Sequence, residues 1–128
     1  MTLVDTSVWV TAKRGADGAL VSALQRLVIA DEVLGHELIY LELLLGAGGD
    51  TRRHLLEDYR RLQTAETLAD AAVVEFCRAH RLDNRGIGAV DAHILAAAHA
   101  RGAAVWTLDR AMSKAAAALR LAFVPDAR

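Results

Sequence analysis

A chain of 128 residues, 54% of them hydrophobic, is long enough to bury a core and too apolar to be a disordered tail. Its net charge of −1 argues against a general polyanion binder. No apolar run approaches the roughly 18 residues of a membrane span, so we expect one domain over residues 1–128 and no membrane segment. No basic and apolar leader opens the sequence, and Cys77 is its single cysteine. Both features favour the reducing cytoplasm.

The N-terminal half of the chain begins with a short β-branched run. Residues 2–4 predict a strand that ends on Asp5, and an apolar run resumes after Ser7. Leucines at helical spacing predict a helix over residues 18–29, and residues 32–36 break that pattern. Residues 37–46 are typical of a buried helix, closed by a glycine-rich turn. Residues 50–63 predict another helix, with an Asp-Thr cap at its start.

The C-terminal half alternates helices and strands. We predict a helix over residues 67–82 with its cap at Thr67, a loop over 83–88, and an alanine-rich helix over 89–102 that stops at Gly102. A strand over 103–108, a helix over 110–120 and a last strand over 121–124 follow. Strands alternating with helices favour parallel strands joined by crossovers. The predicted fold class is therefore α/β, a three-layer sandwich with a central, mostly parallel sheet.

Four acidic residues occupy informative positions in this pattern. Asp5 and Asp109 each follow a predicted strand, and ligands of open parallel sheets bind at the carboxyl ends of the strands. Asp91 lies in the first turn of the helix over 89–102. Glu42 is the one charge within the most apolar helix, where burial would require compensation. A divalent cation shared among these carboxylates would supply it, and hard oxygen ligands suit Mg²⁺ or Mn²⁺.

Each acid also has an ordinary structural explanation. Asp5 could form a turn, Asp91 could interact with a helix dipole, Asp109 could cap the helix that follows it, and Glu42 could face solvent. Glu37 is an alternative to Glu42, although it lies five residues earlier, on roughly the opposite side of the helix. The joint pattern of four acids is more specific than any one of them.

Four short motifs, in this order, resemble those of the PIN-domain family, and within it the VapC ribonuclease toxins. "LVDTSVWV" looks like the family's opening with its first metal acid, and "YLELLLG" looks like its helical glutamate element. "GIGAVDAHILAAA" is similar to the lead into its third acid, and "VWTLDRAM" to its strand-end element with Thr107 and Asp109. The resemblance covers essentially the whole chain, and it implies a PIN-like fold.

The resemblance also implies an activity and partners. It implies an endoribonuclease dependent on Mg²⁺ or Mn²⁺, a homodimer, and a cognate VapB-like antitoxin whose C-terminal segment fills the acidic site. Structured RNA, often transfer RNA, is the substrate class of such toxins. The residues expected in the site divide into three groups: the metal-binding and catalytic acids Asp5, Glu42, Asp91 and Asp109; the hydroxyls that orient them, Thr6, Ser7 and Thr107; and the RNA-binding arginines Arg85 and Arg110, which could instead be ordinary solvated side chains.

Two other functions are compatible with parts of the pattern. One is a PIN-like fold kept as a catalytically silent interaction module, which the loss of one or more acids would indicate. The other is a metal-dependent phosphatase with a strand-end aspartate nucleophile. Haloacid-dehalogenase-like phosphatases need a second aspartate two residues after the first, and this chain has Ser7 there. All four acids are present, so the ribonuclease is the preferred prediction.

Overall fold

The computed structural model, which describes residues 1–46 and 50–125, is built on four parallel strands in the order β3-β2-β1-β4. The strands are β1 (Thr2–Val4), β2 (Val33–Gly35), β3 (Gln63–Thr64) and β4 (Ala104–Trp106). Thr2 pairs with Val33 on one side of β1 and with Ala104 on the other. Parallel neighbours need long crossovers, and here helices supply them. The predicted α/β fold with a parallel sheet is confirmed.

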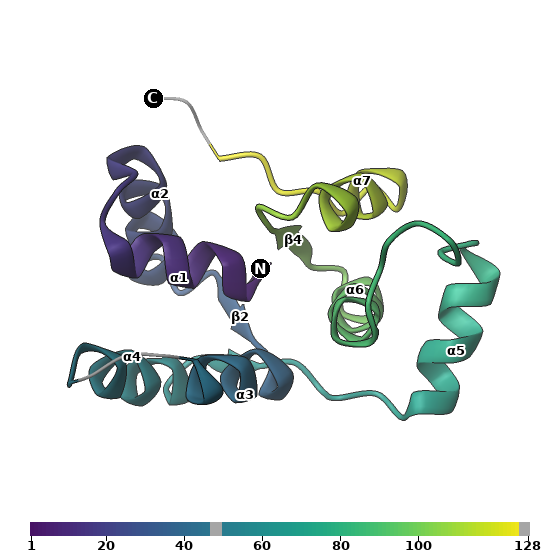
Figure 1. Ribbon diagram of the computed structural model, residues 1–128, viewed down its shortest axis with the longest axis horizontal. Helices are drawn as coiled ribbons and strands as arrows, with labels where there is room; N and C mark the ends of the chain where they lie inside the picture. The colour runs from purple at the N-terminus through teal and green to yellow at the C-terminus, as the bar shows by residue number, and fades with distance from the viewer. Residues whose placement is uncertain (47–49, 126–128) are drawn as a thin grey trace.

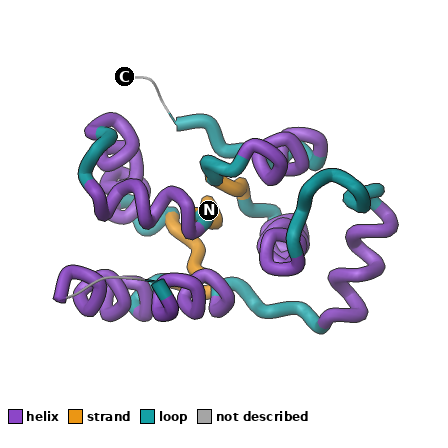
Figure 2. The backbone as a smooth tube through the Cα atoms, in the orientation of Figure 1, coloured by secondary structure: helices purple, strands orange, loops and turns teal. Residues whose placement is uncertain are grey.

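Helices enclose this short sheet. They are α1 (Thr6–Arg14), α2 (Gly18–Ile29), α3 (Glu37–Leu45), α4 (Asp50–Arg60), α5 (Asp70–Ala79), α6 (Ala89–Arg101) and α7 (Arg110–Ala118). Figure 1 shows α1 and α2 to one side of the strands and α6, with α5 beyond it, to the other. Helices α3 and α4 run side by side. Most of the tube in Figure 2 is helix, so the strands act as a small central frame. No described helix is long and apolar enough to cross a bilayer.

Part of the hydrophobic core lies between β1, β4 and the alanine-rich helix α6. Leu3 and Val4 of β1 and Ile94 and Leu95 of α6 are fully buried. Small side chains at positions 96–98 are buried as well, which lets this helix lie close to the strands. Gly102 ends α6 in the left-handed conformation with φ 68°, as predicted. Helix α6 is therefore a firmly packed support for the acid in its first turn.

Helix α1 and strands β2 and β3 were not predicted from the sequence. Residues 8–10 are valine and tryptophan, which have modest helix propensity, yet Val8 and Trp9 are buried on α1. The Trp9 indole N–H donates to the Val4 carbonyl at 3.0 Å, which ties the helix to β1. Strand β2 lies where we expected only a break. Strand β3 has two exposed polar residues and carries no apolar pattern.

Three further expectations are corrected. Residues 121–124 do not form a strand, because one isolated bridge, between Ala122 and Val105, is their whole pairing among the described residues. Helix α5 begins at Asp70 with Ala69 at its N-cap, so Thr67 is not the cap. Helix α3 is not buried all round, since three of its leucines are exposed: Leu41, Leu44 and Leu45.

Candidate active site

The carboxylate of Asp5 is the best-anchored group at the carboxyl edge of the sheet. Asp5 directly follows β1 and is 7% exposed. Its Oδ2 atom accepts hydrogen bonds from the Ser7 hydroxyl at 2.9 Å and the Thr107 hydroxyl at 2.8 Å. The side chain does not cap α1, although Asp5 stands at its N-cap position. Two of the three hydroxyls expected to orient the acids, those of Ser7 and Thr107, therefore hold this one.

The segment after β4 is joined to the same corner. The Thr107 hydroxyl accepts from the Asp109 backbone N–H at 3.1 Å while it donates to Asp5. Asp109 itself caps α7, since its Oδ2 atom accepts from the Met112 backbone N–H at 2.8 Å. Asp109 therefore does cap the helix that follows it, and the cap uses one of its two carboxylate oxygens. The other oxygen takes no bond among the described residues, so capping and ligand binding are compatible.

Glu42 reaches the site differently from the way we expected. We predicted a buried charge in an apolar helix, but Glu42 is exposed on α3, so the argument from the cost of burial was wrong. Its Oε1 atom accepts a 2.6 Å hydrogen bond from the Thr6 hydroxyl, at the start of α1. Thr6 immediately follows Asp5, so this bond brings the α3 carboxylate to the edge where β1 ends. The opposite face of the helix holds the competing Glu37, which pairs with Arg60 at 3.0 Å.

The Asp91 carboxyl is affected by the charges of the other three acids. It lies in the first turn of α6 and is half-buried. Burial raises the pKa of the Asp91 carboxyl, and the nearby charges of Asp5, Asp109 and Glu42 raise it further. A hydrogen bond with the Gly88 backbone opposes these effects. Residues from four separate parts of the chain therefore present like charges to one another at one edge of the sheet.

The donors at this edge fit a hard divalent cation. They are carboxylate and hydroxyl oxygens, with no thiolate or imidazole among them, which suits Mg²⁺ or Mn²⁺ rather than a softer metal. No three Asp, Glu, His or Cys side chains in the described residues already stand close enough together to enclose an ion. Mg²⁺ commonly takes only one or two carboxylates and keeps several waters. The acids can therefore serve as ligands without forming a closed cage.

The two candidate RNA-binding arginines lie near the starts of α6 and α7. Arg85 is exposed in the loop before α6, and Arg110 is the exposed first residue of α7, next to Asp109. Their guanidinium groups are accessible, as a phosphate contact would need, and neither takes part in an ion pair among the described residues. RNA binding by these residues stays a prediction.

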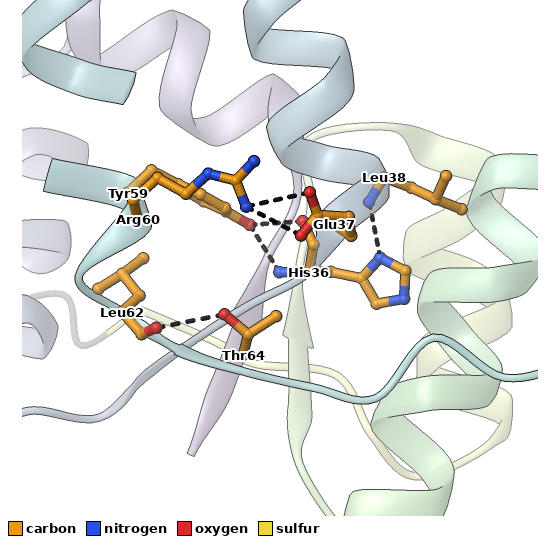
Figure 3. Close-up of polar contacts among 7 residues, drawn as sticks. All are labelled: His36, Glu37, Leu38, Tyr59, Arg60, Leu62 and Thr64. Atoms are coloured by element: carbon orange, nitrogen blue, oxygen red, sulfur yellow. Dashed lines mark hydrogen bonds and ion pairs between the residues drawn. The ribbon is translucent and has the colours of Figure 1, made fainter. Parts of the chain in front are cut away.

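Sequence reasoning missed a polar group at the neighbouring part of the edge. His36 directly follows β2 and is 0% exposed. Its backbone N–H donates to the Tyr59 hydroxyl at 2.8 Å, and its Nδ1 atom accepts from the Leu38 backbone N–H at 3.0 Å. Figure 3 shows the ring turned away from Tyr59 and Arg60. A lone histidine in a segment with no clear periodicity gave no signal of this role.

A family model for the PIN domain matches residues 2–118. The chain belongs to the PIN-domain family. Among curated relatives, this PIN domain is 37% identical to "Ribonuclease VapC32" of Mycobacterium tuberculosis, in both strain CDC 1551 / Oshkosh and strain ATCC 25618 / H37Rv. Each alignment spans 118 residues and 91% of both chains. The resemblance to VapC-type PIN toxins is therefore confirmed.

A solved structure shows the same fold. The structure described as "FitAcB from Neisseria gonorrhoeae" superimposes with a TM-score of 0.62, at 22% identity, over 91% of this PIN domain and 94% of that chain. At this identity the likeness concerns the fold. It supports the PIN-like α/β sandwich.

Proposed function

We propose that this PIN domain is an endoribonuclease toxin that uses Mg²⁺ or Mn²⁺ to cleave structured RNA, with transfer RNA as the expected class. The observation that carries the proposal is the hydrogen bonding at the edge of the sheet: Thr107 joins Asp5 to the Asp109 backbone, and Thr6, next to Asp5, binds Glu42. The charges of these three acids also raise the pKa of Asp91. Carboxylates held at one edge of a sheet repel one another, so this arrangement favours a cation-binding role. The likeness to a ribonuclease of the VapC type supports the same activity.

The chemistry follows from what these residues can hold. Asp5, Glu42, Asp91 and Asp109 would bind the cation, which would acidify a water molecule and neutralise charge on the phosphodiester. The Ser7 hydroxyl donates to Asp5 and accepts from the Leu108 backbone N–H at 3.0 Å, so it is engaged as a support and not poised as a nucleophile. Thr107 and Ser7 keep the Asp5 carboxylate in one orientation. Arg85 and Arg110 would offset the repulsion between RNA and the acidic edge.

An apolar groove supports the expected antitoxin partner. Helices α1, α2 and α4 line a groove of about 680 Å³ whose wall includes Trp9, Leu24, Val28 and Leu55. Ile29, also in this lining, is 85% exposed. Exposed apolar surface of this kind marks protein interaction sites. We therefore place a VapB-like antitoxin here, with its C-terminal segment reaching the acids.

The exposed leucines of α3 support a homodimer. Leu41 and Leu45 are 45% and 75% exposed on the helix that carries Glu42. A second copy of the chain covering this face would remove them from water. We place the protein in the cytoplasm, where a single cysteine stays reduced and RNA substrates are present.

A cleavage assay tests the proposed activity directly. The purified protein, freed of any antitoxin, is incubated with total RNA and with purified transfer RNA, in Mn²⁺ or Mg²⁺ and again with chelator. We expect discrete fragments that require both the metal and Asp91, so that Asp91→Asn gives none. Glu75→Gln is the matched control, because Glu75 is an exposed acid on α5 away from the site. Mapping the fragment ends would identify the target.

A thermal-shift measurement separates the two ways in which cleavage could fail. Mn²⁺ should raise the melting temperature of the wild-type protein by mass action, and at 100 times its Kd the stabilisation is about 2.7 kcal/mol. Asp91→Asn should weaken this response. Intact RNA with a normal Mn²⁺ shift would point to a narrower RNA substrate. Intact RNA with no shift would instead favour the catalytically silent interaction module.

A further inference from the structure

A polar groove between α3 and α4 is separate from the four acids. It has a volume of about 570 Å³ and is lined by one tyrosine, three arginines, a leucine and a glutamate: Tyr40, Arg53, Leu56, Glu57, Arg60 and Arg61. Three arginines thus line one groove of a protein whose net charge is −1. Arginines beside an aromatic ring are a combination that binds the bases and phosphates of single-stranded nucleic acid.

Arg60 is held over the ring of Tyr40. Its guanidinium carbon lies 3.5 Å from the centre of that ring, so the two groups stack. Its Nη1 atom lies 3.0 Å from each carboxylate oxygen of Glu37, and Figure 3 shows the guanidinium turned toward this acid. The Arg60 side chain is nevertheless 53% exposed, so the guanidinium face opposite Tyr40 is open to solvent. We call Arg60 stacked on Tyr40 the guanidinium platform.

The charges around the groove distinguish its arginines. Glu37 neutralises Arg60, which therefore offers a flat surface more than a net charge. Arg61 is 81% exposed and lies 3.8 Å from the equally open Asp58. An exposed pair of this length contributes little, so Arg61 can exchange Asp58 for a phosphate. Because Glu57 also lines the groove, its net positive charge is small, which favours stacking as the main source of affinity.

The guanidinium platform stands at the same edge of the sheet as the acids. Glu37 comes two residues after Gly35, where β2 ends, and β2 is the neighbour of β1 in the sheet. Adjacent strands lie about 4.7–4.9 Å apart. An RNA strand whose phosphodiester lies at Asp5 can therefore extend along this edge to Arg60.

We propose that the guanidinium platform binds an unpaired base of the RNA substrate, and that Arg61 contacts a phosphate beside it. The base stacks on the open face of Arg60, while Tyr40 and Glu37 hold the guanidinium in place. Bases in loops can be turned outward to stack in this way, whereas the bases of a duplex are stacked on one another. The platform thus selects RNA loops over duplexes. This inference rests on the proposed ribonuclease function and adds the part of the substrate that is recognised.

Binding to intact RNA tests the platform without cleavage. The Asp91→Asn protein is titrated with purified transfer RNA in Mg²⁺, and Arg60→Ala and Arg60→Lys are each added to it. Both should weaken binding by about tenfold or more, because lysine keeps the charge but lacks the plane. Arg101→Ala is the matched control, since this exposed arginine ends α6 just before β4 begins, at the opposite edge. Normal binding by Arg60→Ala, or full recovery by Arg60→Lys, would overturn the platform.

Variants of Tyr40 separate stacking from the ion pair with Glu37. Tyr40→Phe keeps a ring beneath the guanidinium and should retain binding. Tyr40→Leu removes the ring and should weaken binding several-fold, although the ion pair can still form. Circular dichroism and urea denaturation show whether each variant is folded under the conditions of the titration. Equal binding by the two folded variants would mean that the ring does not support the base, and the platform would be rejected.

Two further measurements separate base recognition from charge. A fully paired RNA duplex, used as a second probe, should bind equally well with and without Arg60→Ala. A tenfold loss on the duplex as well would overturn the selection of loops. Arg61→Gln should reduce the slope of log Kd against log salt by about 0.7, the value for one phosphate of a single strand. An unchanged slope would overturn the phosphate contact of Arg61.

Cleavage kinetics distinguish failure of the platform from failure of the proposed function. With the four acids intact, Arg60→Ala should raise the KM for transfer RNA about tenfold and leave kcat unchanged. A fall in kcat with KM unchanged would overturn the binding role. Normal binding and cleavage by Arg60→Ala would reject the platform alone. If the wild-type protein neither binds nor cleaves transfer RNA, the proposed function is rejected, and the platform with it.

Discussion

The carboxyl edge of the sheet has two halves that differ in charge and in the way their polar groups are satisfied. After β1 and β4, Asp5 and Thr107 form a corner where hydroxyls hold a carboxylate. After β2, His36 is a neutral, fully buried ring, fixed through its backbone to Tyr59. The first half concentrates negative charge beside Asp91, whereas the second joins the start of α3 to α4. The comparison separates residues that should control chemistry from residues that should control stability.

Asp5→Asn should have the largest effect on activity. Asparagine can still accept from Ser7 and Thr107, so the corner should stay folded, but the negative charge is lost. A bound metal provides several kcal/mol of transition-state stabilisation, and we expect cleavage to fall on the order of a thousandfold. Single-turnover cleavage of transfer RNA, with circular dichroism to confirm folding, would measure it. Activity near that of the wild type would show that the charged half of the edge is dispensable for cleavage.

Thr107→Val should have the next largest effect. Valine keeps the shape of threonine but cannot donate to Asp5 or accept from the Asp109 backbone N–H. Loss of such a support typically reduces metal affinity or activity by about 10–100-fold. Mn²⁺ titration and cleavage rates would measure the loss. Thr107→Ser retains the hydroxyl and should recover most of the function; equal loss in both variants would attribute the effect to packing.

Tyr59→Phe should change stability and leave the chemistry of the folded protein nearly unaltered. It removes the hydroxyl that accepts the buried His36 N–H, which should cost about 1–3 kcal/mol in the free energy of unfolding. Urea denaturation would measure the cost. Tyr40→Phe is the control, because Tyr40 is only half-buried, beneath Arg60, and a change within about 0.5 kcal/mol is expected. A large loss of cleavage by folded Tyr59→Phe would show that the two halves are not separable.

The smallest expected effect is on the stability of the metal-free protein as the pH changes. Because the pKa of Asp91 is raised in the folded state, its contribution to stability is fully present below the pKa of the unfolded chain. It is lost as the pH rises through the folded pKa. Without metal at neutral pH, Asp91→Asn should therefore melt slightly above wild type. The gap should close as the pH falls through the Asp91 pKa. Melting curves of both proteins across pH would show it, and a lower melting temperature for the variant at neutral pH would contradict a charge-crowded Asp91.

Much of the candidate site could be predicted because local signals mark it. A hydrophobic strand that stops at Asp5, and an alanine-rich helix with Asp91 in its first turn and Gly102 at its end, can be recognised without tertiary contacts. Order along the chain then implied a parallel sheet, whose strands end at one edge. The contacts of Ser7 and Thr107 with Asp5 also agree with the prediction. Whether these residues bind metal stays a prediction.

Other features depend on contacts between distant residues. Glu42 lies in an apolar run, and only the packing of α3 against α1 and α4 determines that it faces Thr6 and solvent. Helix α1 forms although valine and tryptophan favour strands, because Val8 and Trp9 bury their side chains in that conformation. Burial offsets a weak local preference, and the sequence pattern does not show it.

Residue types give the charges, and periodicity, caps and connection rules predict from the sequence where most of the helices lie and that the strands run parallel. Which side chains meet, in contrast, depends on how the whole chain packs. The folded chain places Thr107 against Asp5 from opposite ends of the sequence, and the Tyr59 hydroxyl against the His36 backbone N–H. Local preferences act over a few residues, whereas hydrogen bonds and electrostatic repulsion depend on distances that only the folded chain sets.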